Sequence, residues 1–395
     1  MSAILYKQIA EELSQHIDDR VDESSLNRLV LLILGILESK SSKPSQIADA
    51  LHRLKLSGAT AESLERQIRR TENDPEITTA WCFHPFARAH LRAGNPERLI
   101  LIIDPTTQKD RVVKLTVSVW YRGRALPLAW TLWPGNQKLQ GDRFWTRVKQ
   151  LLAQVAPLLP TDLPIIWLAD RAFGTPQFTD LLTPYGWHYV VRVQGQTRCR
   201  DRLGRETMIQ ALVPHKTQRA KLHGQVFKGR GWRAANVVAY WGRGQDTPLC
   251  LVTDLDADWD VLRLYRQRYG IEASFRDEKS RGWDFEACQV RDLDHLERLL
   301  VGMAFATWFA LLTGTQVAAE HLRTPPTSRC SRPWAAKRSL FDLGLSRLRD
   351  WLQGHCQQRL GWRLCDWMAP NWSDQLHFRH RRAFVFRSGK VYACL

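Results

Sequence analysis

The sequence predicts an α/β fold in which a mixed sheet lies between helices, and three observations support this. Residues 99–103 and 163–169 are nearly continuous apolar runs of strand length, which is typical of strands buried on both faces. The first 95 residues instead repeat their apolar positions at helical spacing. From residue 98 onward, strand-like and helix-like stretches follow one another, which favours a sheet with helical cover.

Residues 1–95 are expected to be helical. Their apolar residues recur at helical spacing through 4–17, 26–37, 47–56 and 64–68. A turn at 55–58 separates the last two stretches and gives a helix-turn-helix outline. Helices that bind DNA and helices that only pack produce the same outline, so both interpretations stay open.

Residues 96–194 are expected to form the first part of the sheet. The predicted strands are 99–103, 112–121, 126–132, 163–169 and 188–193, and the predicted helices are 145–155 and 176–182. Residues 195–253 follow as a β-rich insertion with short strands, ending at 249–253.

Residues 254–315 are expected to complete the sheet domain with a long helix from about 258 to 279 and a buried helix at 299–313. The 21 residues from Leu299 to Ala319 carry no charge and are long enough to span a bilayer. Polar residues within them and the lack of a second span favour a core helix, so no membrane partner is expected. The last part, 316–395, is a basic region rich in tryptophan.

The charge of the chain is concentrated in two places. The 395 residues carry a formal charge of +17 and have a sequence pI near 9.8. Residues 195–250 hold 11 Lys and Arg against 3 Asp and Glu, and residues 316–395 hold 14 against 5. Such basic blocks are typical of surfaces that bind polyanions, and nucleic acid is the first candidate.

Several other classes of protein are disfavoured. The eight cysteines include no C-x-x-C pair, which argues against a zinc ribbon and favours buried, reduced thiols in a cytoplasmic protein without a secretory start. A G-x-S-x-G elbow is absent, which argues against that hydrolase class. Asp254, Asp256 and Asp258 resemble a calcium loop, but Trp259 stands where such a loop needs glycine.

Three carboxylates are the candidate catalytic residues. Asp104 and Asp170 each follow a predicted buried strand, so they are expected at strand ends, where neighbouring carboxylates repel unless a cation lies between them. Glu272 lies on the predicted helix after the insertion. Tyr265, Arg268, Arg276 and Lys279 share its face at α-helical spacing, so one face offers a metal-binding carboxylate with cations that could hold phosphates. A solvated face with salt pairs is the alternative.

These residues resemble the Y-R-E-K signature of bacterial insertion-sequence DDE transposases, the insertion-sequence-four group. Tyr265, Arg268, Glu272 and Lys279 match its spacing, and Asp104 and Asp170 match the two earlier acidic positions. Two positions depart from the family pattern, since Pro105 and Ala172 replace its usual Asp and Gly. The resemblance spans about 98–315 and implies an RNase H-like fold with a β-rich insertion before the last catalytic helix and an N-terminal helical DNA-binding domain.

The resemblance also implies an activity. The carboxylates of Asp104, Asp170 and Glu272 would hold two Mg²⁺ ions, which Mn²⁺ could replace, for cleavage at transposon ends and joining to target DNA. The implied partners are the inverted-repeat ends, the target DNA and a second copy of the chain in a synaptic complex, in the bacterial cytoplasm at the nucleoid. The expected DNA-binding residues are Tyr265, Arg268, Arg276, Lys279, Arg171, Arg198, Arg200, Arg202 and Arg205. Two alternatives stay open: a metal-dependent nuclease of the same fold without strand transfer, and a domesticated, non-catalytic DNA-binding protein.

Overall fold

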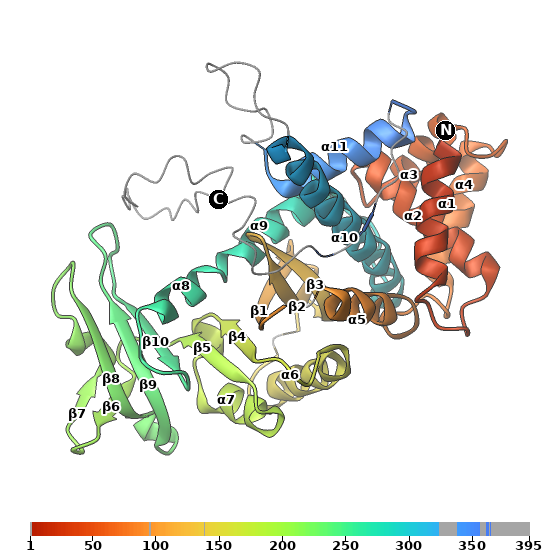
Figure 1. Cartoon of the computed structure of the whole chain (residues 1–395). Helices are drawn as coiled ribbons and strands as arrows, with labels where there is room; N and C mark the ends of the chain where they lie inside the picture. Colours follow the sequence, from red (N-terminus) through yellow and green to blue (C-terminus); the bar gives the residue numbers. More distant parts are fainter. Residues whose placement is uncertain are drawn as a thin grey trace.

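The computed structural model describes residues 2–94, 96–137, 139–323, 338–355, 361, 362 and 364. Most of the predicted C-terminal basic region, 316–395, therefore lies outside the described residues. In the rest of the chain, helices and a large mixed sheet form an α/β fold, as the sequence predicts (Figure 1).

The strands of the described chain form one ten-stranded sheet in the order β3-β2-β1-β4-β5-β10-β9-β8-β6-β7. They are β1 (Leu99–Gln108), β2 (Val112–Tyr121), β3 (Arg124–Pro134), β4 (Ile165–Ala169), β5 (His188–Arg192), β6 (Arg198–Asp201), β7 (Glu206–Met208), β8 (Arg219–Val226), β9 (Arg233–Tyr240) and β10 (Leu249–Thr253). The β1–β4 and β4–β5 pairs are parallel, and the other pairs are antiparallel.

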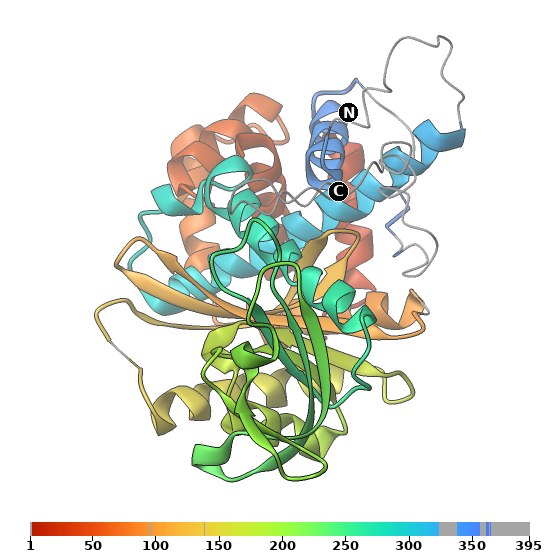
Figure 2. The ribbon, with the colours of Figure 1, turned by 90° about the vertical axis from the view of Figure 1, so that its left-hand side faces the viewer.

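The α-helices lie at both faces of this sheet and at one end of it (Figures 1 and 2). They are α1 (Ser2–Ser14), α2 (Glu23–Ser39), α3 (Pro44–Leu54), α4 (Ala61–Asn73), α5 (His84–Ala93), α6 (Asp142–Val155), α7 (Pro176–Leu182), α8 (Asp260–Arg266), α9 (Tyr269–Arg276), α10 (Leu293–Arg323) and α11 (Leu340–Leu352). The predicted helices of residues 1–95 are present. The helical spacing did not separately predict α5 or the short π-helix Thr79–Phe83 before it.

Side-chain alternation along the central strands creates two hydrophobic cores. Leu101, Ile103 and Trp167 belong to the larger core, which includes α6, α7, α10 and the N-terminal helices. Ile102 and Leu168 belong to a second core on the opposite face, which α8 and α9 cover. Successive residues of a strand point to opposite faces, so the next even-numbered positions, 104 and 170, face α8 and α9.

The first predicted strand is longer than expected, which corrects the placement of Asp104. Strand β1 does not end before Asp104 but continues to Gln108, because residues 104–108 still pair with β2. Its pairing with β4 ends at Ile103. Pro105 is tolerated there because it lies beyond the part of β1 that pairs with β4.

The predicted continuous helix from 258 to 279 is three helical segments instead. Helix α8 ends at Arg266, where backbone bonds of the i→i−3 type replace α-helical bonds through Ile271. Helix α9 follows, and a π-helix, Asp277–Arg281, closes the segment. Gly270 allows the tight approach of α9 to the sheet, because a Cβ there would meet Trp120 Cδ1 at 3.1 Å and the carbonyl of Arg124 at 3.2 Å.

The basic insertion is rich in strands, as predicted, but it does not form a separate sheet. Strand β10 pairs with β5, and β9, β8, β6 and β7 extend the sheet from there. Figure 1 shows this extension at one end of the molecule and the N-terminal helices at the other. The insertion is thus joined to the central strands by main-chain hydrogen bonds.

Helix α10 is the buried helix that the sequence predicts, although it runs past the expected boundary at residue 315. Residues 293–320 are long and apolar enough to cross a membrane, but 83% of the most hydrophobic window is buried inside the protein. The helix packs against α2, α4, α11 and β3. This packing favours the core-helix interpretation. The described cysteines, Cys82, Cys199, Cys250 and Cys288, are free and buried.

Candidate active site

Asp104 and Asp170 are brought side by side by the pairing of β1 with β4. The last paired residues of these parallel strands are Ile103 and Ala169, so the two aspartates are the next residues in register. Both positions face α8 and α9, because each follows a residue of the second core by two positions. The predicted proximity of these carboxylates therefore follows from strand register rather than from two strand ends.

Glu272 is linked to Asp104, one of the two aspartates, by the side chain of Arg268. The Arg268 Nη1 atom donates to Asp104 Oδ2 at 2.9 Å, and its Nη2 atom donates to Glu272 Oε1 at 2.6 Å. Arg268 is 6% exposed, whereas the Glu272 side chain is 48% exposed. One buried guanidinium thus bridges the first and third candidate carboxylates.

Burial and the neighbouring charges both shift the pKa of Asp104. Burial raises the pKa of Asp104 to about 6; Arg268 opposes this shift, and Asp170 and Glu272 add to it. Burial also lowers the pKa of Arg268, but Tyr265 and the three carboxylates outweigh that effect and raise it above its ordinary value. Arg268 therefore stays charged and offsets carboxylate repulsion.

Asp170 has two contacts of its own. The hydroxyl of Tyr265, a residue that is 1% exposed, donates to Asp170 Oδ1 at 3.4 Å. Arg192 Nη1 lies 3.9 Å from the same oxygen. Sequence reasoning missed Arg192, although its position two residues after Val190 of the second core was a usable signal.

Two further residues were predicted on the face of Glu272. Arg276 is exposed at the end of α9, four residues after Glu272, and Lys279 lies in the π-helix that follows. Among the described residues, hydrogen bonds and ion pairs to the three carboxylates come from Tyr265, Arg268 and Arg192. Glu272 and Arg276 therefore keep the common face predicted for them, and a role of Arg276 and Lys279 in binding DNA stays a prediction.

Two ion pairs missed by sequence reasoning hold the π-helix on the sheet. Arg124 Nε donates to Asp277 Oδ2 at 2.8 Å, and Lys114 Nζ pairs with both carboxylate oxygens of Glu278. All four side chains are largely buried. These pairs fix the end of the helical segment that carries Glu272.

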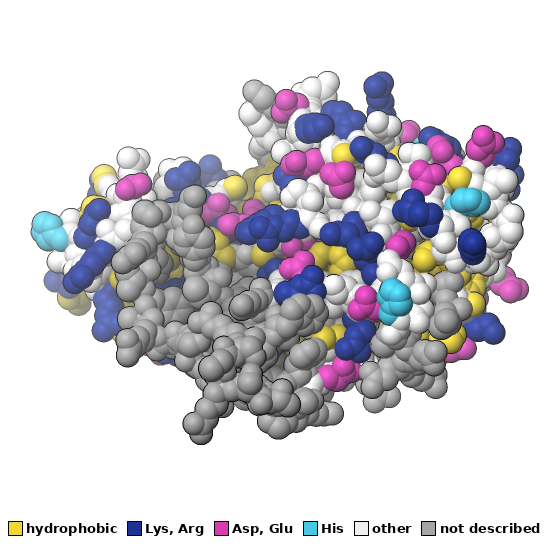
Figure 3. Space-filling model, turned by 90° about the horizontal axis from the view of Figure 1, so that it is seen from above, with side chains coloured by type: hydrophobic (Ala, Val, Ile, Leu, Met, Phe, Trp, Pro, Cys, Tyr) yellow, Lys and Arg dark blue, Asp and Glu magenta, His cyan; other side chains and the backbone are white. Residues whose placement is uncertain are grey.

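The predicted DNA-binding arginines of the insertion differ in their exposure and in their side-chain partners. Arg198 and Arg202 are exposed, Arg205 pairs with Asp201 at 2.7 Å, and Arg200 lies over the Trp232 ring at 4.5 Å. A hollow of about 590 Å³, lined in part by Arg200 and Arg202, lies beside them. Figure 3 shows several basic side chains at the end of the molecule that carries the insertion. Arg171, another predicted DNA-binding residue, is exposed directly after Asp170.

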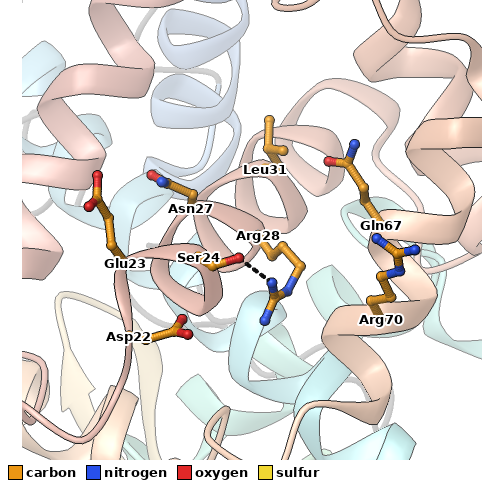
Figure 4. Close-up of a pocket in the computed structure, with 8 residues that line it drawn as sticks. All are labelled: Asp22, Glu23, Ser24, Asn27, Arg28, Leu31, Gln67 and Arg70. Atoms are coloured by element: carbon orange, nitrogen blue, oxygen red, sulfur yellow. Dashed lines mark hydrogen bonds between the residues drawn. The ribbon is translucent and has the colours of Figure 1, made fainter.

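A larger hollow of about 620 Å³ lies between α2 and α4, far from the carboxylates in sequence (Figure 4). Arg28 donates to Ser24 Oγ at 2.5 Å and also pairs with Asp74, which neutralises it. The acidic residues Asp22 and Glu23 line the same hollow. Its mixed charge gives no strong attraction for DNA, and DNA binding by the N-terminal helices stays a prediction.

The three carboxylates suit a hard divalent cation. Carboxylate oxygens are the ligands that Mg²⁺ prefers, and no softer donor is among these three residues. Their ligand atoms do not all lie within 4.8 Å of one another, since Arg268 lies between Asp104 and Glu272. Binding of two ions would therefore require the guanidinium to move.

The comparisons with known proteins agree with a site of this kind. Residues 146–309 match the family model of the transposase DDE domain. This match covers less than half of the chain; it includes Asp170 and Glu272, whereas Asp104 precedes it. The class of domain indicated for this stretch is that of DDE transposases. The closer resemblance to the insertion-sequence-four group stays a prediction.

The other comparisons add little. No curated protein matches the chain. A cryo-EM structure of a piggyBac transposase synaptic complex with hairpin DNA is similar over 88% of this chain and 76% of that chain, with a TM-score of 0.45 and 13% sequence identity.

Proposed function

We propose that this protein is a DNA transposase of the insertion-sequence-four group, which cleaves DNA at transposon ends and joins those ends to target DNA. The observation that carries the proposal is the register of β1 and β4, which sets Asp104 beside Asp170 beneath the helix of Glu272. The match of residues 146–309 to a transposase DDE domain supports the same activity. The strand order β3-β2-β1-β4-β5, with β2 antiparallel to both neighbours, supports an RNase H-like fold.

The reaction is a pair of phosphoryl transfers. Water attacks a phosphorus atom at the transposon end and breaks its bond to the 3′ oxygen. The freed 3′-hydroxyl then attacks a phosphodiester of the target, and the target's own 3′ oxygen leaves as a hydroxyl. Mg²⁺, held as two ions by Asp104, Asp170 and Glu272, would activate the attacking oxygen and neutralise the leaving oxygen, and Mn²⁺ would substitute.

The surrounding residues of the chain would orient the DNA. Arg192 and Tyr265 already hold Asp170, and Arg268 would contact a DNA phosphate once it leaves the carboxylates. Arg171, Arg276 and Lys279 would contact the DNA backbone around the site, and the exposed arginines of the insertion would hold the inverted repeat. Two ends must meet for joining, so a homodimer in the cytoplasm, acting at the nucleoid, belongs to the same proposal.

A strand-transfer assay tests the proposal. The substrate is an oligonucleotide duplex that carries the inverted repeat flanking the gene, mixed with plasmid target and Mg²⁺. The proposal predicts nicked ends and joined products for the wild type. Asp104→Asn, Asp170→Asn and Glu272→Gln should bind the end with near-normal affinity and yield neither product.

The alternatives give different results in the same assay. A nuclease of this fold would cleave without joining, and a non-catalytic DNA-binding protein would bind without cleaving. Glu286→Gln is the matched control, because it removes an exposed negative charge from the short 3-10 helix Phe285–Ala287, and Glu286 is not among the candidate residues. Cleavage and joining by the three carboxylate variants would disprove the proposed site.

A further inference from the structure

Three potential metal ligands lie together among the N-terminal helices, and none of them belongs to the candidate active site. Glu12 lies in α1, His16 follows that helix by two residues, and His90 lies in α5. Glu12 Oε1 is 3.2 Å from His90 Nε2 and 3.5 Å from His16 Nε2. The three ligand atoms all lie within 4.8 Å of one another.

These separations match those around a small cation. Ligand atoms at 2.0–2.1 Å from a tetrahedral zinc ion lie about 3.3 Å from one another. The two distances from Glu12 bracket that value, and the two imidazole ligand atoms lie within 4.8 Å of each other. Glu12 and His16 are four residues apart, so both side chains project from one side of the helix end.

His90 is the buried member of the three, and its contact with Glu12 does not have the geometry of a hydrogen bond. Its side chain is buried, with 5% of the residue exposed, and its Nε2 atom makes no hydrogen bond although it points at Glu12. A buried polar atom without a hydrogen bond is costly unless a ligand satisfies it. The ring is held in place by Phe86, at a centroid distance of 4.2 Å, and by Trp308 at 5.9 Å.

We propose that Glu12, His16 and His90 form a binding site for a divalent transition cation of the zinc class. Two imidazoles and one carboxylate favour Zn²⁺ over Mg²⁺, which distinguishes this site from the proposed catalytic one. Glu12 and His16 are partly exposed, so water can take the fourth position. The ion joins the end of α1 to α5 and so stabilises the N-terminal helices.

The protonation states agree with this assignment. Burial raises the pKa of Glu12, but its contacts with His90 and His16 outweigh burial and lower it overall. Burial lowers the pKa of His16, and Glu12 only partly opposes that shift. Both shifts are toward the forms that bind a cation, a charged carboxylate and a neutral imidazole.

Metal binding by the tag-free, full-length protein tests the proposal. The protein is first treated with a chelator, and Zn²⁺ and Co²⁺ are then titrated separately. We expect one tight equivalent of Zn²⁺ and tetrahedral d–d absorption with Co²⁺ that lacks the near-ultraviolet band of cysteine ligands. His90→Ala and His16→Ala should each weaken binding by at least about 100-fold, the upper end of the effect of losing an outer-shell partner.

A matched control and a second set of variants make the outcome decisive. His188 also pairs with a carboxylate, 2.8 Å from Asp254, so His188→Ala should leave the stoichiometry and affinity unchanged. If His90→Ala does not fold, the partly exposed His16 and Glu12 decide the question through His16→Ala and Glu12→Ala. Absence of a tight equivalent, binding that these variants leave unchanged, or a cysteine-type Co²⁺ spectrum would overturn the proposal.

Discussion

Arg268 shows how a single buried charge can organise a group of carboxylates. Its guanidinium bonds both Asp104 and Glu272, and it is itself buried between them. The sequence placed Arg268 on the same helix face as Glu272, and the structure adds the contact with Asp104, 164 residues away along the chain. A role in phosphate binding stays a prediction, since both of its nitrogens that face the site are occupied by carboxylates.

Replacing Arg268 should therefore affect stability in a pH-dependent way. Arg268→Ala leaves Asp104 buried without its cation, which should cost about 3 kcal/mol at pH 8. The loss should be smaller at pH 5, where the carboxyl of Asp104, whose pKa is about 6, takes up a proton. Urea denaturation at the two pH values measures this, with Arg276→Ala as the exposed control. An equal loss at both pH values would contradict the assignment.

Glu72 is a second residue whose burial predicts a measurable effect. It is 3% exposed, its Oε1 atom makes no hydrogen bond, and burial raises its pKa to about 7, with Arg69 opposing and Glu65 adding to the shift. The folded protein thus binds this proton more tightly than the unfolded chain. Stability from this group is present below a pH of about 4.5 and is lost as the pH rises toward 7.

Glu72→Gln removes that titration. The variant should match the wild type near pH 4.5 and exceed it at pH 8 by up to about 3 kcal/mol. Denaturation curves from pH 4.5 to 8 test this, and Glu62→Gln, which changes an exposed acid of the same helix, is the control. Parallel pH profiles for Glu72→Gln and the wild type would show that Glu72 titrates normally.

At the scale of elements, the sequence predicted those strands and helices that a local pattern of apolar residues determines. Aliphatic runs identified β1 and β4, and the aspartates that follow them are neighbours in the structure. The break between α8 and α9 and the π-helix after α9 were not predictable from helical spacing. They depend on contacts with distant residues, such as the approach of Gly270 to Trp120 and the pairing of Asp277 with Arg124.

The Arg124–Asp277 pair gives a test of how the π-helix supports the site. Arg124→Ala leaves Asp277 unpaired at a position where burial already raises its pKa, so we expect a loss of about 3 kcal/mol. Cleavage should fall more than DNA binding, because the end of the helical segment carrying Glu272 loosens. The double variant Arg124→Met, Asp277→Leu should regain most of the stability, since no buried charge is left unpaired.

The two readouts separate a positioning role from a purely structural one. If the pair only stabilises the fold, the double variant should regain cleavage together with stability. If it positions α9, cleavage should stay reduced in the stable double variant. Equal cleavage by wild type and Arg124→Ala at a temperature where both are folded would contradict a positioning role.

At the scale of the whole molecule, the continuous sheet links the basic insertion to the candidate active site. Strand β10 of the insertion pairs with β5, and β5 carries Arg192, which faces Asp170. DNA held by the insertion would therefore have a fixed position relative to the carboxylates. The sequence predicted the strands and the charge of the insertion. It did not predict that these strands extend the central sheet, because β10 pairs with β5, which is distant from it in the sequence.

The salt dependence of DNA binding tests whether this surface is used. Arg198 and Arg202 are exposed, so replacing both with Gln should remove two phosphate contacts. The slope of log Kobs against log salt concentration should then fall by about 1.8, at roughly 0.9 per contact. Arg205→Gln should change the slope less, because Asp201 already pairs with Arg205 in the same hairpin. An unchanged slope in the double variant, with affinity also unchanged, would show that the DNA follows another face of the molecule.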